Sequence, residues 1–424
     1  MTAVLLVVLF LVLMGIGVPI AFSLAVSSLI YLLISGVPLT IVPQTMFAGI
    51  NSFVLLAIPA FILAGNLMNH GGITDRIIQF SNASVGRIRG GLGLTNVASS
   101  LGFGGISGTA LSDTASIGSV MIPAMKKQGY GAGFSAAVTS MSSTVGPMIP
   151  PSLPMIIIGT LAGVSIGDLF LAGAVPGILL AIGFLIVTYI ISVKRQYPKE
   201  EAQPLKAVLK SFLGSFWALL MVIIILWGIL GGYFTPTEAA VVAVIYALVI
   251  GGLIYRELKW KEVPKILADT IIATAAILLL VGFANLFGWI LVSEGIPTAV
   301  AESILSVSEN PILITLLLLL LLIVVGMFLE TIAALTILFP VLLPIATSIG
   351  MDPVHFGVVM VLTLMIGLST PPVGVCLFVA SDLADVSIGE AFKEMIPFLG
   401  VALLVLLCVS FIPSLSLFLP GLFE

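Results

Sequence analysis

The sequence has very little charge: only 8% of its 424 residues are Asp, Glu, Lys or Arg, against about 25% in soluble domains. So few charges cannot cover a water-facing surface, which excludes a soluble enzyme, a nucleic-acid-binding protein and a disordered chain. Cysteine is also scarce: Cys376 and Cys408 lie in apolar runs without CxxC spacing, so no disulfide framework is expected.

Motifs that carry enzyme chemistry are missing as well. His70 and His355 form neither an HExxH motif nor a pair, so no transition-metal site is expected. No serine stands in a GxSxG elbow, and no nucleophile has a base at matched depth. The chain is therefore not expected to be an enzyme.

Hydrophobic residues make up 60% of the chain, about 254 residues (0.60 × 424). A membrane-spanning helix needs about 20 apolar residues, so the chain is predicted to be an all-α polytopic membrane protein. Met1–Ala3 lacks a basic region, and the first run is expected to stay as a span rather than to be a signal peptide. Ten spans are predicted, near residues 2–15, 18–35, 50–69, 131–160, 170–193, 212–231, 236–255, 267–292, 355–381 and 395–418.

Two further apolar stretches, 92–122 and 311–346, contain Gly, Pro, Ser, Thr and one acid each. We interpret them as re-entrant hairpins, because irregular backbone at membrane depth is tolerated only inside protein or along a cavity. Two amphipathic stretches, 73–89 and 297–307, follow matched spans. They are interpreted as interfacial helices, with ordinary loops as an equal alternative.

The basic residues indicate an orientation. Ten spans and two hairpins, with the N-terminus outside, put all 15 Lys and Arg residues in inside loops. The bases are Arg76, Arg87, Arg89, Lys126, Lys127, Lys194, Arg195, Lys199, Lys206, Lys210, Arg256, Lys259, Lys261, Lys265 and Lys393. The outside loops then carry only acids, namely Asp168, Glu294, Glu302, Glu309, Asp352 and Glu424.

An internal repeat is visible when the chain is shifted by 221 residues (344 − 123). The shift places Pro123, Gly129, Gly146, Pro150-Pro151 and Pro176 on Pro344, Gly350, Gly367, Pro371-Pro372 and Pro397. Each half then has five spans and one hairpin, and an odd number of spans turns the second half upside down. Inverted repeats with broken helices are typical of secondary transporters.

The clearest motif is the run from Ser142 to Ser152, whose Pro147, Pro150 and Pro151 cannot continue a helix. Its repeat partner is the run 367–374. A break frees backbone carbonyls, and the half-helix that follows presents N–H groups and a positive dipole end. The alternative is a pair of kinked helices without a ligand, which the repetition disfavours.

The hairpin tips are the second motif. The first tip, 104–114, is rich in small and hydroxyl residues that allow close backbone approach and suit a hard cation; the alternative is close helix packing. The second tip lies near 326–331. Acids inside membranes are functional candidates by default. Asp113 and Glu330 qualify, with a structural hydrogen bond as the alternative, whereas Glu238 is more readily a first-turn helix residue.

No Lys or Arg lies within any predicted span or hairpin. An anionic substrate at the midplane would therefore lack a basic partner. Helix N-termini and co-transported cations would have to offset its charge.

These motifs resemble a known family. The Ser-Gly-Thr-Ala hairpin at 107–110, the Gly-Pro-Met-Ile-Pro-Pro-Ser run at 146–152 and the Ser-Thr-Pro-Pro-Val-Gly run at 369–374 resemble the large membrane subunit of tripartite ATP-independent periplasmic (TRAP) transporters. The resemblance implies a sodium-driven importer of organic acids, of the sialic acid or C4-dicarboxylate type, in the bacterial inner membrane, with the N-terminus periplasmic. It also implies a periplasmic substrate-binding protein and a small four-helix membrane subunit, expected here as separate polypeptides, with Na⁺ as the coupling ion and no organic cofactor.

The family is similar to elevator transporters, in which a domain with both hairpins slides against a scaffold. Carried over to this chain, the scaffold comprises 1–91 and, with a cytoplasmic linker, 194–310. The transport domain comprises 92–193 and 311–424. A stand-alone sodium- or proton-coupled carboxylate carrier of the same superfamily is the alternative, and a channel would need no mobile half.

The hypothesis for the site places one sodium at each hairpin and break, with the substrate carboxylate between the two breaks. The expected cation-binding residues are Ser107, Gly108, Thr109, Ser143, Thr144, Gly146, Gly326, Thr331, Gly367, Ser369 and Thr370. The expected substrate-binding residues are Ser112, Asp113, Pro147, Pro150, Ser152, Glu330, Pro371 and Gly374.

Overall fold

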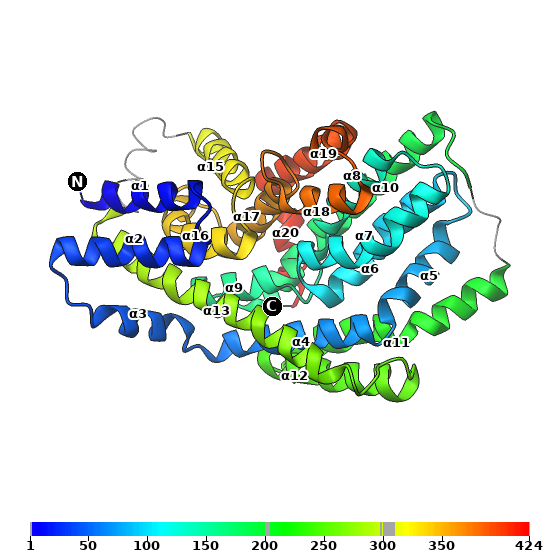
Figure 1. The fold of residues 1–424 in the computed structure, drawn as a ribbon, viewed down its shortest axis with the longest axis horizontal. Helices are drawn as coiled ribbons and strands as arrows, with labels where there is room; N and C mark the ends of the chain where they lie inside the picture. The colour runs from blue at the N-terminus through cyan, green and yellow to red at the C-terminus, as the bar shows by residue number, and fades with distance from the viewer. Residues whose placement is uncertain (1, 200–203, 297–298, 300–309, 424) are drawn as a thin grey trace.

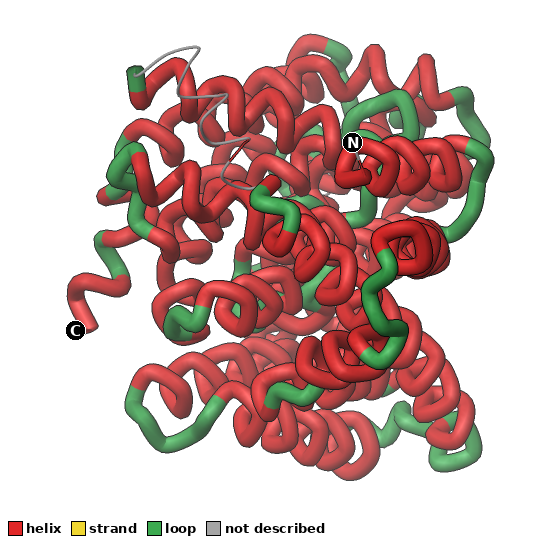
Figure 2. Tube along the Cα trace, turned by 90° about the vertical axis from the view of Figure 1, so that its left-hand side faces the viewer, coloured by secondary structure: helices red, strands yellow, loops and turns green. Residues whose placement is uncertain are grey.

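The computed structural model describes residues 2–199, 204–296, 299 and 310–423, and these residues fold into helices joined by turns (Figures 1 and 2). No strand occurs in this part of the chain, which confirms the all-α fold class. The first half contains α1 (Thr2–Gly15), α2 (Ile20–Ser35), α3 (Ile41–Ile50), η1 (Phe53–Leu56), α4 (Ala57–His70), α5 (Ile73–Val85), α6 (Gly91–Ser107), α7 (Ala110–Lys127), α8 (Ala132–Ser143), η2 (Gly146–Met148), α9 (Leu153–Ala162) and α10 (Ile166–Lys194). The second contains α11 (Leu205–Leu230), α12 (Pro236–Val249), the π-helical turn η3 (Ile250–Ile254), α13 (Val263–Ser293), α15 (Pro311–Gly326), α16 (Thr331–Ser348), α17 (Pro353–Leu368), α18 (Val375–Ala384), α19 (Ile388–Phe411), α20 (Ser414–Leu417) and α21 (Pro420–Phe423).

Both stretches predicted as hairpins form two helices joined by a short turn, α6 with α7 and α15 with α16. In the first turn Gly108 adopts a left-handed φ of 62°, and the hydroxyl of Thr109 caps α7 by accepting from the amide of Ser112. In the second turn the carboxylate of Glu330 caps α16. Each hairpin thus turns where a small or capping residue permits it.

Both predicted helix breaks are present. Helices α8 and α9, with η2 between them, are bent by 42° where Pro147, Pro150 and Pro151 interrupt the helical hydrogen bonds. Helices α17 and α18 are separated by residues 369–374, and the Pro150-Pro151 and Pro371-Pro372 peptide bonds are both cis.

The core lies around the two helices that precede the breaks. Every residue of α8 from Gly133 to Ser143 is buried, and so is every residue of α17 from His355 to Leu368. The second halves of the broken helices pack across the repeat: α9 contacts α16 and α17, while α18 contacts α7 and α8. The elements of the two predicted repeats are therefore interlocked in the centre of the molecule (Figure 1).

A pair of glycines holds each hairpin against the break of its own half. A Cβ on Gly104 of α6 would lie 2.5 Å from the Cα of Gly146, and a Cβ on Gly367 would lie 2.7 Å from the Cα of Gly326 in α15. Real side chains do not approach so closely, so only glycine allows these backbones to touch. Gly146 and Gly367 are also partners at the repeat offset of 221 residues (367 − 146).

By length and hydropathy, seven described helices can cross a membrane, or eight if the bent pair α8 and α9 is one span. The seven include α16, which was assigned to the second hairpin. The predicted ten also counted α1, α2 and the pair of α17 and α18, which are shorter apolar helices. The number of spans, the outside N-terminus, the inverted orientation and the division into scaffold and transport domain remain predictions.

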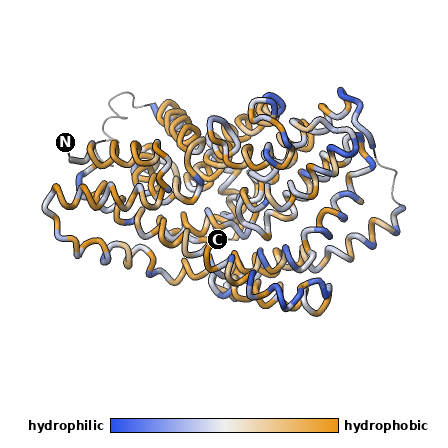
Figure 3. The backbone as a smooth tube through the Cα atoms, in the orientation of Figure 1, coloured by the Kyte–Doolittle hydropathy of each residue, from blue (hydrophilic) through white to orange (hydrophobic). Residues whose placement is uncertain are grey.

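Several boundaries differ from the prediction. Helix α3, at Ile41–Ile50, was not predicted, and the last long helix runs over 388–411 rather than 395–418. The amphipathic stretch 73–89 forms helix α5, which packs on α11 and α6; the other, 297–307, lies outside the described residues except for Ala299. Figure 3 shows hydrophilic backbone toward the right of the view, where α10 ends near Lys194.

We expect Gly104→Ala to lower the free energy of unfolding by about 1–3 kcal/mol, because the added methyl meets backbone that cannot yield. Gly400→Ala is the matched control: it also lies within a helix, and its Cβ would meet nothing within 4 Å. Thermal unfolding of the detergent-solubilised protein measures the difference. Equal unfolding temperatures of the two variants would contradict this role of the glycine pair.

Candidate functional site

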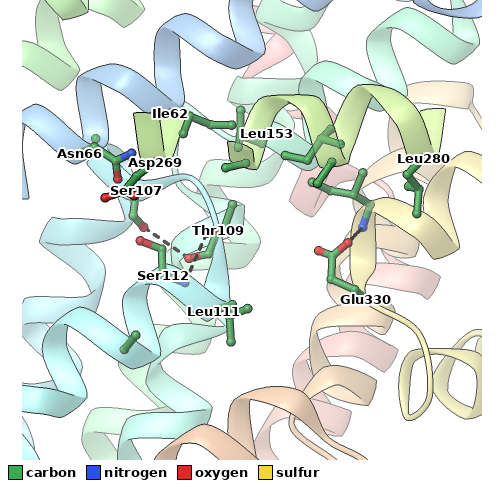
Figure 4. Close-up of a pocket in the computed structure, with 16 residues that line it drawn as sticks. Ile62, Asn66, Ser107, Thr109, Leu111, Ser112, Leu153, Asp269, Leu280 and Glu330 are labelled. Atoms are coloured by element: carbon green, nitrogen blue, oxygen red, sulfur yellow. Dashed lines mark hydrogen bonds between the residues drawn. The ribbon is translucent and has the colours of Figure 1, made fainter. Parts of the chain in front are cut away.

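A cavity of about 600 Å³ lies where the hairpin tips face α4 and α13 (Figure 4). The first hairpin contributes Ser107, Thr109 and Ser112, and the second contributes Glu330. The opposite wall belongs to α4 and α13. The remaining lining residues are Ile62, Gly65, Asn66, Leu111, Ala115, Leu153, Asp269, Ala273, Ala276, Ile277, Leu280 and Ile332.

The first tip is held by its own hydroxyls and by the break beneath it. The Ser107 hydroxyl donates to the Thr109 carbonyl at 3.4 Å, and the Ser112 amide donates to the Thr109 hydroxyl at 3.4 Å (Figure 4). A Cβ on Gly108 would lie 3.2 Å from the carbonyl oxygen of Pro151. The tip and the break therefore form one surface at the cavity.

Three helices begin at this cavity. First-turn residues of α7 (Leu111 and Ser112), α9 (Leu153) and α16 (Ile332) all line it. The N-terminus of a helix carries unpaired N–H groups and about half a positive charge. Neutral side chains cap two of these ends, Thr109 on α7 and Ser152 on α9. The cavity thus has positive dipole ends although no Lys or Arg lines it.

Two of the three acids for which a structural role was the alternative, Glu330 and Glu238, cap helices. The Glu330 carboxylate accepts from the amides of Ile332 at 2.9 Å and Ala333 at 3.4 Å, so it already occupies the N-terminus of α16. Glu238 forms a capping box with Thr235 at the start of α12 and does not line the cavity. The structural interpretation of Glu238 is therefore confirmed, and Glu330 has both a capping role and a place in the cavity wall.

A buried polar network lies behind the first tip. Ser100 donates to Asp113 Oδ1 at 3.4 Å and to the hydroxyl of Ser142 at 3.1 Å, and Ser142 donates to the Oδ1 atom of Asn96 at 3.2 Å. Asp113 Oδ2 is buried and has no hydrogen-bond partner, and a Cβ on Gly146 would lie 3.4 Å from it. The unpaired carboxylate oxygen and the nearby hydroxyl oxygens are ligands of the kind that a hard cation prefers.

The second break also has buried hydroxyl groups, and the start of α16 has one without a partner. Ser369 and Thr370 are buried, and the Thr370 hydroxyl donates to the Ile366 carbonyl at 2.7 Å. The Ser369 hydroxyl reaches across to α8 and donates to the Ser140 carbonyl at 3.1 Å. The Thr331 hydroxyl, at the start of α16, is buried without a partner.

Four of the expected site residues line the cavity, namely Ser107, Thr109, Ser112 and Glu330. The others lie behind it, in the tips and breaks: Gly108, Asp113, Ser143, Thr144, Gly146, Pro147, Pro150, Ser152, Gly326, Thr331, Gly367, Ser369, Thr370, Pro371 and Gly374. Asp113 does not line this cavity, since its side chain is fully buried in the hydroxyl network. Its expected contact with substrate stays a prediction.

Sequence reasoning missed Asn66 and Asp269, which line the wall opposite the first tip (Figure 4). Asn66 donates to the Thr270 hydroxyl at 3.0 Å and so joins α4 to α13. Asp269 lies inside the predicted span 267–292, so the rule that intramembrane acids are functional candidates could have found it. In the described chain no three residues among His, Cys, Asp and Glu are grouped as metal ligands.

Known proteins support one family. Residues 7–415 match the protein family described as "Tripartite ATP-independent periplasmic transporter, DctM component". The chain is 40% identical to the sialic acid TRAP transporter large permease protein SiaM of Vibrio cholerae, over 96% of each protein. It is 38% identical to the C4-dicarboxylate TRAP transporter large permease protein DctM of the same organism, over 100% of this chain and 98% of that protein.

A solved structure shares the fold alone. The YdaH transporter of Alcanivorax borkumensis superimposes with a TM-score of 0.61 at 16% identity, covering 89% of this chain and 90% of that one. The full-length match to the family description and the identity to two large permease proteins determine the classification. The chain belongs to the DctM family, the large permease component of tripartite ATP-independent periplasmic transporters.

Proposed function

We propose that this subunit imports an organic acid anion across the bacterial inner membrane by sodium symport, with substrate delivered by a periplasmic binding protein. The substrate class is that named for the relatives, sialic acid or C4-dicarboxylate. The observation that carries the proposal is a cavity with helix N-termini and hairpin tips on one wall and no base in its lining.

The substrate carboxylate faces the N-terminal turns of α7 and α9, beside Ser107, Thr109 and Ser112. Both ends have neutral cap side chains, but α7 carries Asp113 in its first turn whereas α9 has no acid there. The dipole of α9 is therefore the more available to an anion. At α16 the Glu330 carboxylate already fills this role. The proposed substrate position is thus nearer the first tip than the second.

One sodium binds between the first tip and its break, at Ser107–Thr109 and Ser143–Gly146. The unpaired Asp113 Oδ2 beside Gly146 supports this position, because a cation there would supply the missing partner. We therefore assign Asp113 to the cation rather than to the substrate. A second sodium binds between Gly326–Thr331 and Gly367–Thr370, where the unpaired Thr331 hydroxyl is the corresponding donor.

Transport requires the tips and breaks to move as one body. The glycine pairs join each hairpin to its break backbone to backbone, whereas the wall across the cavity includes the small residues Gly65, Ala273 and Ala276 among larger ones. Small side chains let one surface slide past another. This supports an elevator in which 92–193 and 311–418 move against 1–91 and 205–310, with a small four-helix subunit as membrane partner.

Reconstitution tests the proposal. Proteoliposomes that contain the chain, its small membrane subunit and the binding protein should take up labelled sialic acid or succinate in a saturable way under an inward sodium gradient. Uptake should fall to background when either the gradient or the binding protein is omitted. Sodium-driven uptake by the chain alone would instead establish a stand-alone carrier, and non-saturable flux would establish a channel.

Removal of proposed sodium ligands should weaken sodium dependence. We expect Ser107→Ala and Thr370→Ala each to raise the half-saturating sodium concentration about two- to tenfold, as for the loss of one polar contact. Asp113→Asn should raise it further, because it also removes the negative charge. Initial uptake rates against sodium concentration measure this.

The matched control is Ser119→Ala on α7, an exposed hydroxyl that bonds only its own helix at Ser116. It should behave as the unmodified protein does. If Ser107→Ala and Thr370→Ala leave the sodium dependence unchanged while transport persists, the proposed ion positions are wrong.

A further inference from the structure

The cavity is lined by two carboxylates and by no base. Glu330 comes from the second hairpin, and Asp269 comes from α13 on the opposite wall (Figure 4). The ion pairs in the described chain join Arg76 to Glu257, Arg195 to Glu394 and Lys259 to Glu262, so none of them neutralises Asp269. Lys265 precedes it by one helical turn but does not line the cavity.

The cavity extends along one half of α13. Its lining runs from Asp269 to Leu280, about 16 Å of a helix whose residues span 263–293. On α4 it includes Ile62 to Asn66, in the half that ends at His70. Lys265 lies in the first turn of α13, and Arg76 lies in the first turn of α5, which follows α4. The cavity therefore lies in the half of α4 and α13 that is nearer these bases, the side that the proposed function makes the cytoplasm.

Asp269 is thus placed on the exit side. It is exposed in the cavity, lies across from the first tip, and belongs to a helix outside the proposed mobile part. A carboxylate on this wall repels an anion held at Ser107 and Thr109 only while the tips face the basic side. When the tips face the opposite side of the membrane, they would be distant from Asp269, and the repulsion would be lost.

From this geometry we propose that the Asp269 carboxylate lowers the affinity of the inward-facing cavity for an anionic substrate and so promotes release into the cytoplasm. The proposal rests on the proposed function. In this proposal the scaffold wall repels the substrate electrostatically, and it does so only when the cavity faces the cytoplasm. Asn66 is its neutral neighbour on the same wall and the natural place to add a second charge.

The test separates the two sides of the membrane. In proteoliposomes with the complete transporter, labelled sialic acid or succinate, whichever the unmodified protein takes up, is supplied outside. The same unlabelled compound is preloaded inside. Asp269→Asn should lower the internal concentration that half-inhibits uptake by about three- to tenfold, as expected for removal of one nearby charge in a wet cavity. The external KM should not change.

Further variants test whether the charge of Asp269 causes the effect. Asp269→Glu should match the unmodified protein, and so should Asp75→Asn, which removes an exposed acid of α5 that does not line the cavity. Asn66→Asp should shift the internal value in the opposite direction, because it adds a negative charge on the same wall. The effect of Asp269→Asn should shrink when choline chloride raises the ionic strength.

Two results would overturn the inference: an unchanged internal half-inhibition in both Asp269→Asn and Asn66→Asp, or equal shifts of the internal value and the external KM. A shift that is insensitive to choline chloride would also reject an electrostatic cause. Failure of the proposed function would give a different result: the unmodified protein would show no sodium-driven uptake.

Discussion

Backbone groups that a broken helix frees inside a membrane must find partners within the protein, and this constraint governs the centre of the molecule. Pro150-Pro151 and Pro371-Pro372 follow two helical segments, Gly133–Ser143 and His355–Leu368, whose residues are all buried. A hairpin approaches each break to backbone contact through a pair of glycines. The second halves of the broken helices then pack across the repeat. The hairpins, the hydroxyl network and the cavity all follow from covering these two breaks.

The hairpins and breaks were predictable because proline and glycine act locally. A proline pair stops a helix whatever surrounds it, and a positive φ at Gly108 is available to glycine at little cost. Partnerships between distant residues were not predictable. That Asp113 would be buried among hydroxyls and that Asp269 would face a cavity depend on how helices pack. No spacing in the sequence encodes these contacts.

The scarcity of charge has a structural counterpart. A cavity without a base can still accommodate an anion if helix ends face it, and here two such ends have neutral cap side chains, Thr109 on α7 and Ser152 on α9, with Asp113 in the first turn of α7. Dipole ends are weaker than an arginine, and they are fixed to the tips. In the proposed mechanism, an anion bound at these helix ends would move with them, and weak binding would favour its release.

The bond from Ser369 to the Ser140 carbonyl links the two breaks directly, and Ser143 donates to the same carbonyl. One carbonyl oxygen of α8 thus accepts hydrogen bonds from a serine beside each of the two breaks. If ligands bound at both breaks and one of them altered the affinity for the other through this carbonyl, the effect would be mutual and by the same factor, because binding linkage is reciprocal.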